Sequence, residues 1–220
     1  LGGVITALFI ALQIQSNHIQ MSYYFMFVIL FFIIAYFVDA YEKKELPHFF
    51  KASAILALAA VVGVCVNISN LYHTYEYSKE TMRGKSELKQ EGPAANQTSS
   101  GLDRDYITNW SYGIGETLTL LVPNVKGGGC STTLSQNETA MAKANPMYGN
   151  LYSQLPPYFG DQPWTAGPVY VGAFVVFLFI LGCFIVKGPL KWALLGATIF
   201  SILLSWGKNF MGLTDFFIDY

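Results

Sequence analysis

Polar side chains that could bind or activate a substrate occur between long apolar segments of this chain. Asn17, His18 and Gln20 share one turn, and Glu116 is the sole charged residue within the apolar stretch 106–125. A carboxylate in so apolar a setting is disfavoured unless it meets a cation or hydrogen-bond donors. Further ionisable candidates of the same kind are Asp103, Arg104, Asp105, Asp161 and Lys208.

The segments that must position these groups have the composition of membrane spans. The chain is 53% apolar and only 12% charged, whereas soluble domains have about 25% charged residues. Four stretches contain no Asp, Glu, Lys or Arg, and they approach or reach the roughly 17–25 residues that cross a bilayer core. They are 22–38, 52–71, 168–186 and 192–206. The sequence therefore predicts an integral membrane protein, and its net charge of −1 gives no basic field for nucleic acid.

The pattern predicts an all-α, polytopic transmembrane bundle of about five spans. The expected spans are 1–16, 22–41, 50–71, 168–186 and 190–206. They divide the chain into three helices in 1–71, a long polar loop at 72–166, two helices in 167–206, and the start of a further segment at 207–220. Because Leu1 already lies in an apolar run and FFIDY ends the chain, we expect an internal piece of a larger membrane protein with a truncated first span.

Lysines in short turns predict the orientation, because Lys and Arg near span ends are retained in the cytoplasm. One short turn carries Lys43, Lys44 and Lys51, and a second carries Lys187 and Lys191. Only Lys208 follows the last span. The polar turn at 17–21, the long loop at 72–166 and the C-terminal segment at 207–220 then lie on the outer side of the membrane. A crossing at 112–125 would put the two lysine turns on opposite sides, so that stretch is interpreted as a re-entrant or interfacial helix.

Several polar features have two interpretations. His18 and Gln20 could serve a site or simply cap span ends, and the aromatic side chains near span ends could form an interfacial belt or a sugar-stacking surface. These aromatics are Tyr23, Tyr24, Trp110, Trp164, Tyr170 and Trp206. KGGGC at 126–130 lacks the ending of a phosphate loop and is interpreted as a turn. Segments 83–100 and 130–150 are interpreted as mobile connectors.

Four separated motifs carry a resemblance to a known family. They are NHIQMSYY, NWSYGIGETLTLLVPNVKGG, YFGDQPWTAGPVYVGAF and LLSWGKNF, in this order. Together they closely resemble the YfhO-like family of bacterial membrane proteins, and the long loop looks like the Bacteroidetes branch. The resemblance covers nearly the whole chain.

The resemblance implies a GT-C type glycosyltransferase in the bacterial inner membrane, with the long loop periplasmic or extracellular. Such an enzyme moves a sugar from a polyprenyl-phosphate carrier to an envelope polymer or lipid acceptor. Enzymes of this type keep a catalytic acidic residue in the first outer loop, which we expect upstream of this chain, and whether a divalent metal is needed stays open. The resemblance assigns no metal ligand. It implies that the substrate-binding candidates are His18, Gln20, Glu116, Asp161 and Lys208.

The most specific expectation from the sequence concerns Glu116 and Lys208. In one interpretation they form an ion pair that locks the loop onto the bundle. In the other, Lys208 holds the donor phosphate as a point charge and Glu116 contacts an acceptor hydroxyl or a metal, so that Glu116→Gln and Lys208→Met abolish transfer and leave stability nearly intact. A lipid or polysaccharide transporter or flippase, and a non-catalytic membrane scaffold, are the alternative functions.

Overall fold

The computed structural model describes residues 1–81, 102–163 and 165–219, and within these ranges the regular structure is helical. An isolated antiparallel bridge joins Gly129 to Ala166. The chain divides into two compact units. The first comprises Leu1–Glu91 and Ile185–Ile199, and the second comprises Gly92–Phe184 and Phe200–Tyr220.

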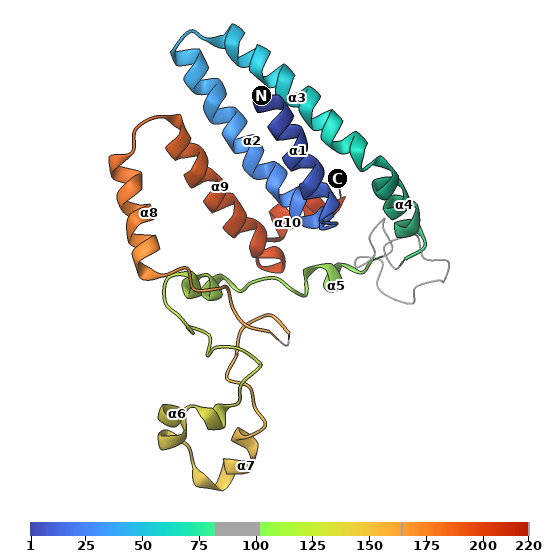
Figure 1. Ribbon diagram of the computed structural model, residues 1–220. Coiled ribbons are helices and arrows are strands. Elements are labelled where there is room, and N and C mark those ends of the chain that lie inside the picture. The colour runs from blue at the N-terminus through green and yellow to red at the C-terminus, as the bar shows by residue number, and fades with distance from the viewer. Residues whose placement is uncertain (82–101, 164, 220) are drawn as a thin grey trace. The chain divides into compact units, whose positions relative to one another are not determined.

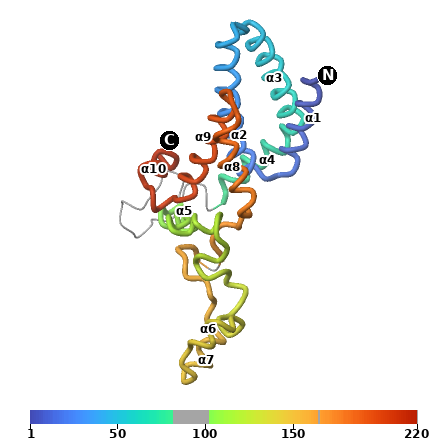
Figure 2. Tube along the Cα trace, turned by 90° about the vertical axis from the view of Figure 1, so that its left-hand side faces the viewer, coloured from blue at the N-terminus to red at the C-terminus, as the bar shows by residue number. Residues whose placement is uncertain are grey.

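The first unit is a bundle of apolar helices. Its elements are α1 (Gly2–Gln15), α2 (Ile19–Glu42), α3 (Leu46–Val66), α4 (Ile68–Lys79) and the first part of α9 (Pro189–Ser205). Figures 1 and 2 show α2 and α3 as a hairpin, with α1 packed along α3. Asn17 and Lys44 both have φ of 59°, a left-handed conformation that lets the chain reverse between consecutive helices.

Small residues allow these helices to approach closely. A Cβ atom on Gly63 of α3 would lie 2.8 Å from Cγ2 of Ile10 and 2.9 Å from the carbonyl oxygen of Ala7, both on α1. Asn67, directly after α3, donates from Nδ2 to the carbonyl oxygen of Ala11 at 3.0 Å. Close backbone contact through small residues is how helices associate where lipid replaces water.

Candidate membrane spans are found for part of the predicted bundle. Helices α2 and α3 are long and apolar enough to cross a membrane, and a third span results if α9 and the helical segment Gly207–Asp219 are counted together across their 112° bend. Helix α1 has 14 residues and α8 (Ala173–Ile185) has 13, which is short for a crossing. Apolar helices therefore lie in all five predicted places, but five crossings stay a prediction.

The helix at the predicted third span, 50–71, ends at Val66. Helix α3 stops at Val66, and the polar helix α4 follows directly after Asn67, so the segment 72–166 begins inside a helix. At the cytoplasmic end that the lysines predict, Lys43 forms an ion pair of 2.7 Å with Asp39. The hydrogen bond to Asp39 raises the pKa of Lys43.

The second unit consists of short helices and turns. Its elements are α5 (Arg104–Thr108), η2 (Ile114–Leu120), η3 (Leu134–Gln136), α6 (Glu138–Lys143), η4 (Pro146–Tyr148), α7 (Gly149–Tyr152), α8, the end of α9, η5 (Gly207–Phe210) and α10 (Met211–Asp219). The predicted helix at 112–125 is the seven-residue 3₁₀ helix η2, and its entry into a membrane stays a prediction.

The two predicted connectors have different outcomes. Residues 83–100 lie outside the described residues. The stretch 130–150 contains short helices, two of them capped by asparagine: Asn137 Oδ1 accepts from the Ala140 amide and Asn145 Oδ1 accepts from the Met147 amide, both at 3.0 Å. The prediction missed these helices because such caps give single turns a fixed start without an apolar repeat.

Candidate functional site around Glu116

Glu116 is completely buried, with 0% of its surface exposed, and it lies at the third position of η2. Its Oε2 accepts a hydrogen bond of 2.8 Å from the backbone amide of Gly113. A glutamate at this position that reaches back to the residue before the helix is one half of a capping box. The carboxylate therefore fixes the start of the helix on which it lies.

The other carboxylate oxygen of Glu116 binds a distant segment. Oε1 accepts from the hydroxyl of Tyr158 and, at 2.9 Å, from the backbone amide of Asp161. The Tyr158 hydroxyl in turn accepts from the Gln162 amide at 3.1 Å. Glu116 thus joins η2 to residues 158–162, and three donors in place of a cation satisfy its charge.

Tyr158 is buried and must stay protonated to donate this hydrogen bond. Burial, and after it the hydrogen bond to Glu116, raises the pKa of Tyr158 well above its ordinary value of 10.0. Desolvation disfavours the phenolate, and a phenolate beside a carboxylate would also be repelled. Tyr158 is therefore a donor to Glu116 at any physiological pH.

Glycine is required where the two segments meet. A Cβ atom on Gly160 would overlap Oε1 of Glu116 and the hydroxyl of Tyr158. A Cβ atom on Gly113 would lie 2.7 Å from Oδ2 of Asp161. Gly160 therefore leaves space for the Glu116 carboxylate, and Gly113 leaves space for the Asp161 carboxylate.

Residues after α9 complete the cluster. The Lys208 amide donates to Oγ of Ser111 at 2.9 Å, and Lys208 Nζ lies 3.4 Å from the backbone oxygen of Asp161. Asn209 Nδ2 donates to the backbone oxygen of Tyr112 at 2.9 Å and to Oδ2 of Asp161 at 3.3 Å. Three sequence-distant stretches, 111–116, 158–162 and 208–209, therefore converge within the second unit.

Of the two interpretations of Glu116 and Lys208, the ion pair is not formed in the structure. Among the described residues, Glu116 has only backbone and tyrosine donors as partners, and Lys208 Nζ bonds a carbonyl oxygen. Glu116 is sealed from solvent, whereas Lys208 and Asp161 are exposed. The two residues thus lie in one cluster with different roles: Glu116 is a structural anchor, and Lys208 is accessible to a ligand.

The two remaining predicted residues belong to the first unit. His18 precedes α2 and makes no side-chain hydrogen bond to its first turn, and Gln20 Nε2 donates to the hydroxyl of Tyr24 at 3.2 Å. Both side chains are exposed. The structure brings Glu116, Asp161 and Lys208 together within the second unit, whereas His18 and Gln20 belong to the first unit.

The aromatic residues of the sequence analysis are mostly accessible. Tyr23, Tyr24, Trp110 and Tyr170 are exposed. Trp206 is half-buried and donates from Nε1 to Oγ1 of Thr117 at 2.8 Å. Trp164 lies outside the described residues. Both the interfacial belt and the stacking surface stay predictions.

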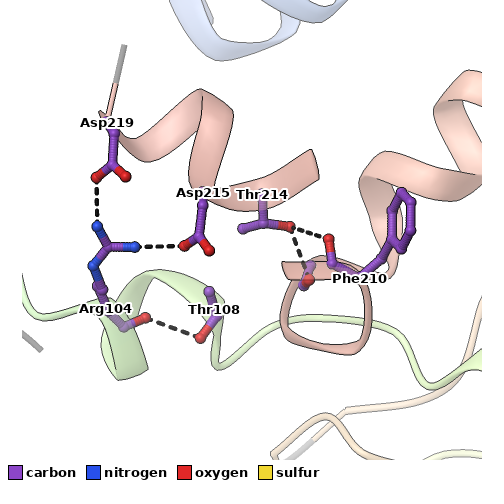
Figure 3. A network of polar contacts seen from close by, with 7 residues as sticks. Arg104, Thr108, Phe210, Thr214, Asp215 and Asp219 are labelled. Carbon is purple, nitrogen blue, oxygen red and sulfur yellow. Dashed lines mark hydrogen bonds and ion pairs between the residues drawn. The ribbon is translucent and has the colours of Figure 1, made fainter. Parts of the chain in front are cut away.

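A second polar cluster joins α5 to α10 (Figure 3). Arg104 Nη1 lies 2.5 Å from Oδ1 of Asp215, and its Nη2 pairs with Oδ1 of Asp219. The two aspartates are four residues apart on α10 and so lie on one helix face. Sequence analysis singled out Arg104 but missed its partners, although the spacing of Asp215 and Asp219 was a visible signal.

Three further members of the Glu116 cluster escaped the sequence analysis: Tyr158, Gln162 and Asn209. Gln162 reaches back from Nε2 to the Trp110 carbonyl oxygen at 2.5 Å. Chemically, the accessible part of the cluster offers an ammonium, a carboxylate and an amide, which suit an anionic group and a neighbouring hydroxyl. Among the described residues, no three His, Cys, Asp or Glu side chains are grouped as metal ligands.

Comparison with known proteins adds no relative. No protein-family model matches the chain, and no curated protein or solved structure matches it either.

Proposed function

We propose that this chain is part of an integral-membrane glycosyltransferase of the bacterial inner membrane. In this proposal the enzyme moves a sugar from a polyprenyl-phosphate donor to an envelope polymer or lipid acceptor on the outer face. The four motifs that resemble YfhO-like proteins support it, and the apolar helices α2 and α3 supply the required membrane anchor.

The observation that carries the proposal is the exposed group of Lys208, Asp161 and Asn209 on a frame fixed by Glu116. Lys208 supplies the point charge that a donor phosphate requires. Asp161 and Asn209 can hydrogen-bond sugar hydroxyls, because a carboxylate accepts and an amide both donates and accepts. Glu116 acts through Asp161 and is a positioning residue, which changes the role expected from the sequence.

The remaining parts of the proposal rest on the resemblance. His18 and Gln20 contribute further polar contacts to the substrate, and the proposal assigns no catalytic residue to this chain. The loop and the C-terminal segment face the periplasm or the exterior, as the lysine turns predict.

Sugar transfer by the full-length protein in membrane vesicles tests the proposal. With a radiolabelled polyprenyl-phosphate sugar as donor, Lys208→Met and Asp161→Asn should each lower transfer at least tenfold, because each removes a charge-assisted contact worth about 1.5–3 kcal/mol. Lys143→Met, on the exposed face of α6, is the matched control and should retain transfer. Unchanged transfer in both site variants would reject this site.

Labelling tests the proposed sides of the membrane. Cys130 should react with an impermeant thiol reagent in intact cells, and a cysteine replacing Glu45 in the lysine turn should not. The reverse pattern would show that the orientation is wrong.

A lipid or polysaccharide flippase is the second candidate, and one observation favours it. The 112° bend between α9 and Gly207–Asp219 has the geometry of a broken span or of a re-entrant loop, and broken helices are typical of transporters. In the same vesicles, a flippase would move the lipid-linked sugar across the bilayer without any acceptor. Glycosyl transfer instead requires the acceptor and forms a new glycosidic product.

A further inference from the structure

The bend between α9 and the segment Gly207–Asp219 occurs directly before Lys208. The two helical segments together are long and apolar enough to count as one span, yet they meet at 112°. Gly207, at the bend, has φ of 39°, a left-handed conformation that glycine adopts at little cost. The sequence thus permits a break at this point, and tertiary contacts decide whether the break is kept.

Two backbone groups at the bend are paired with residues 111 and 112 instead of within a helix. In a continuous helix the Lys208 amide would donate to the carbonyl oxygen four residues earlier. In the structure it donates to Oγ of Ser111 at 2.9 Å. Similarly, the Ser205 carbonyl oxygen accepts from the Tyr112 amide at 2.8 Å. One dipeptide therefore satisfies two groups that the break frees, which avoids the cost of leaving them unpaired.

Ser111 fits this position closely. It is 6% exposed, and its hydroxyl donates to the Thr108 carbonyl oxygen at 2.6 Å while it accepts from the Lys208 amide. A Cβ atom on Gly207 would overlap Oγ of Ser111. The hydroxyl therefore occupies the space beside Gly207, and both its donor and its acceptor capacity are used at the bend.

Side chains before and after the bend fix its two arms. Trp206, directly after α9, donates from Nε1 to Oγ1 of Thr117 at 2.8 Å, which ties this arm to η2. On the other arm, Thr214 of α10 donates from Oγ1 to the Gly207 carbonyl oxygen at 2.8 Å (Figure 3). These contacts lie within the second unit. The bend is therefore a built element of that unit.

We propose that Ser111 holds the break at 205–209 and thereby positions the Lys208 ammonium beside Asp161, whose backbone oxygen lies 3.4 Å from Nζ. Without the Ser111 hydroxyl the Lys208 amide loses its acceptor, and pairing within a continued helix becomes its alternative. That change would carry Lys208 away from Asp161. Ser111 is thus a positioning residue. Its effect on Lys208 as a substrate contact rests on the proposed function, whereas its effect on the bend does not.

Spin-label distances across the bend test the first part of the inference. The labels are attached through Ser201→Cys and Phe216→Cys in the full-length protein, with its native cysteines replaced by serine. Fifteen residues of continuous helix would separate the labelled positions by about 22 Å, and the bent form should give one narrow, shorter distance. Ser111→Ala should broaden the distribution and shift it towards the longer value.

Two further variants show whether the hydroxyl is responsible. Ser111→Thr keeps a hydroxyl and should keep the short distance. Ser153→Ala is the matched control, because it removes an exposed hydroxyl of the same unit that donates to the Asn150 carbonyl oxygen at 2.8 Å. It should leave the distance distribution unchanged.

Transfer kinetics in membrane vesicles test the second part. Ser111→Ala should raise KM for the polyprenyl-phosphate sugar about fivefold and leave kcat nearly unchanged, because it displaces a contact that holds the donor before and during the reaction. Combined with Lys208→Met, Ser111→Ala should lower transfer no further than Lys208→Met alone, because its effect acts through Lys208. A residue that only stabilised the fold would add its own loss.

Unchanged distances in Ser111→Ala, or an equal change in Ser111→Thr, would overturn the role of the hydroxyl at the bend. Additive losses in the double variant would overturn its action through Lys208. If Lys208→Met alone leaves transfer unchanged, the proposed transfer site fails, and the distances still decide whether Ser111 holds the bend. If Ser111→Ala does not fold, Gly207→Ala decides the question, because its methyl group displaces the Ser111 hydroxyl from the other side.

Discussion

The two units bury opposite kinds of side chain. Among the described residues, the buried apolar side chains of the first unit are alanines, at positions 35, 40, 59, 193 and 197, whereas those of the second unit are Tyr158 and Pro168. The buried polar residues Thr108, Ser111, Glu116 and Thr119 all belong to the second unit. The two units are therefore stabilised internally by different interactions: close packing of small residues in the first, and hydrogen bonds of buried polar groups in the second.

The predicted membrane setting of the first unit accounts for this difference. Helices in lipid gain nothing from hiding apolar surface, so close contact at Ala59 and Gly63 supplies van der Waals packing instead. The second unit has too few buried apolar side chains for an ordinary core, so the hydrogen bonds of Glu116 join its segments. Steric changes should therefore damage the first unit, and changes of hydrogen bonding or charge should damage the second.

Glu116→Gln should have the largest effect. The amide cannot accept from Gly113, Tyr158 and Asp161 at once, because its nitrogen faces one of these donors. We expect the free energy of unfolding of the second unit to fall by about 2–3 kcal/mol. Hydrogen exchange should rise at 111–122 and 158–162 and stay unchanged in α2 and α3.

Glu138→Gln, on the exposed surface of α6, is the control for this variant and should leave exchange unaltered. Sugar transfer should also fall in Glu116→Gln, together with stability, whereas Lys208→Met should lower transfer alone. A stable Glu116→Gln protein would contradict the assignment of Glu116 as an anchor.

Gly63→Ala tests the steric half of the comparison. The added methyl group would press on Ile10 and on the carbonyl oxygen of Ala7, so α1 and α3 must separate slightly, at a cost of about 1–3 kcal/mol. Gly182→Ala in α8 is the matched control, because no atom lies within 4 Å of its new methyl group. In thermal unfolding in detergent, Gly63→Ala should melt at a lower temperature than Gly182→Ala. Equal melting temperatures would show that the contact between α1 and α3 accommodates the added methyl group without cost.

The same contrast explains what could be predicted from the sequence. Uncharged apolar runs locate all five apolar helices, because the thickness of the bilayer sets how many consecutive apolar residues a span needs. The isolated position of Glu116 also predicts that it needs partners. The identity of those partners was not accessible, since Tyr158 lies 42 residues away and its hydrogen bond depends on how turns fold. Helix α10 was missed because MGLTDFFID is too short for a helical repeat to stand out.

Tyr158 makes the second unit sensitive to alkaline pH. Its pKa in the folded protein is raised above 10.0, so the stability that it contributes is complete below about pH 10 and is lost as the pH rises further. In that range the free energy of unfolding should fall by up to about 1.4 kcal/mol per pH unit.

Tyr158→Phe should remove this alkaline dependence and cost about 1–2 kcal/mol at neutral pH, because Glu116 loses a donor. Denaturant unfolding of the second unit at pH 7 to 11 measures both effects. An alkaline loss of equal size in Tyr158→Phe would assign the titration to another group.

The Arg104 cluster should give the smallest effects, because it is partly exposed (Figure 3). The side chains of Asp215 and Asp219 are 44% and 48% exposed, and such pairs contribute at most about 1 kcal/mol. Asp219 ends α10, where a negative charge also opposes the helix dipole, so Asp219→Asn should change stability less than Asp215→Asn. Arg104→Gln should cost more than either, since it leaves two carboxylates four residues apart to repel each other. Hydrogen exchange in α10 at low and high salt measures this order, and salt should shrink all three differences. A large, salt-independent loss in Asp219→Asn would instead show that α10 is anchored by a charge pair as strongly as η2 is anchored by Glu116.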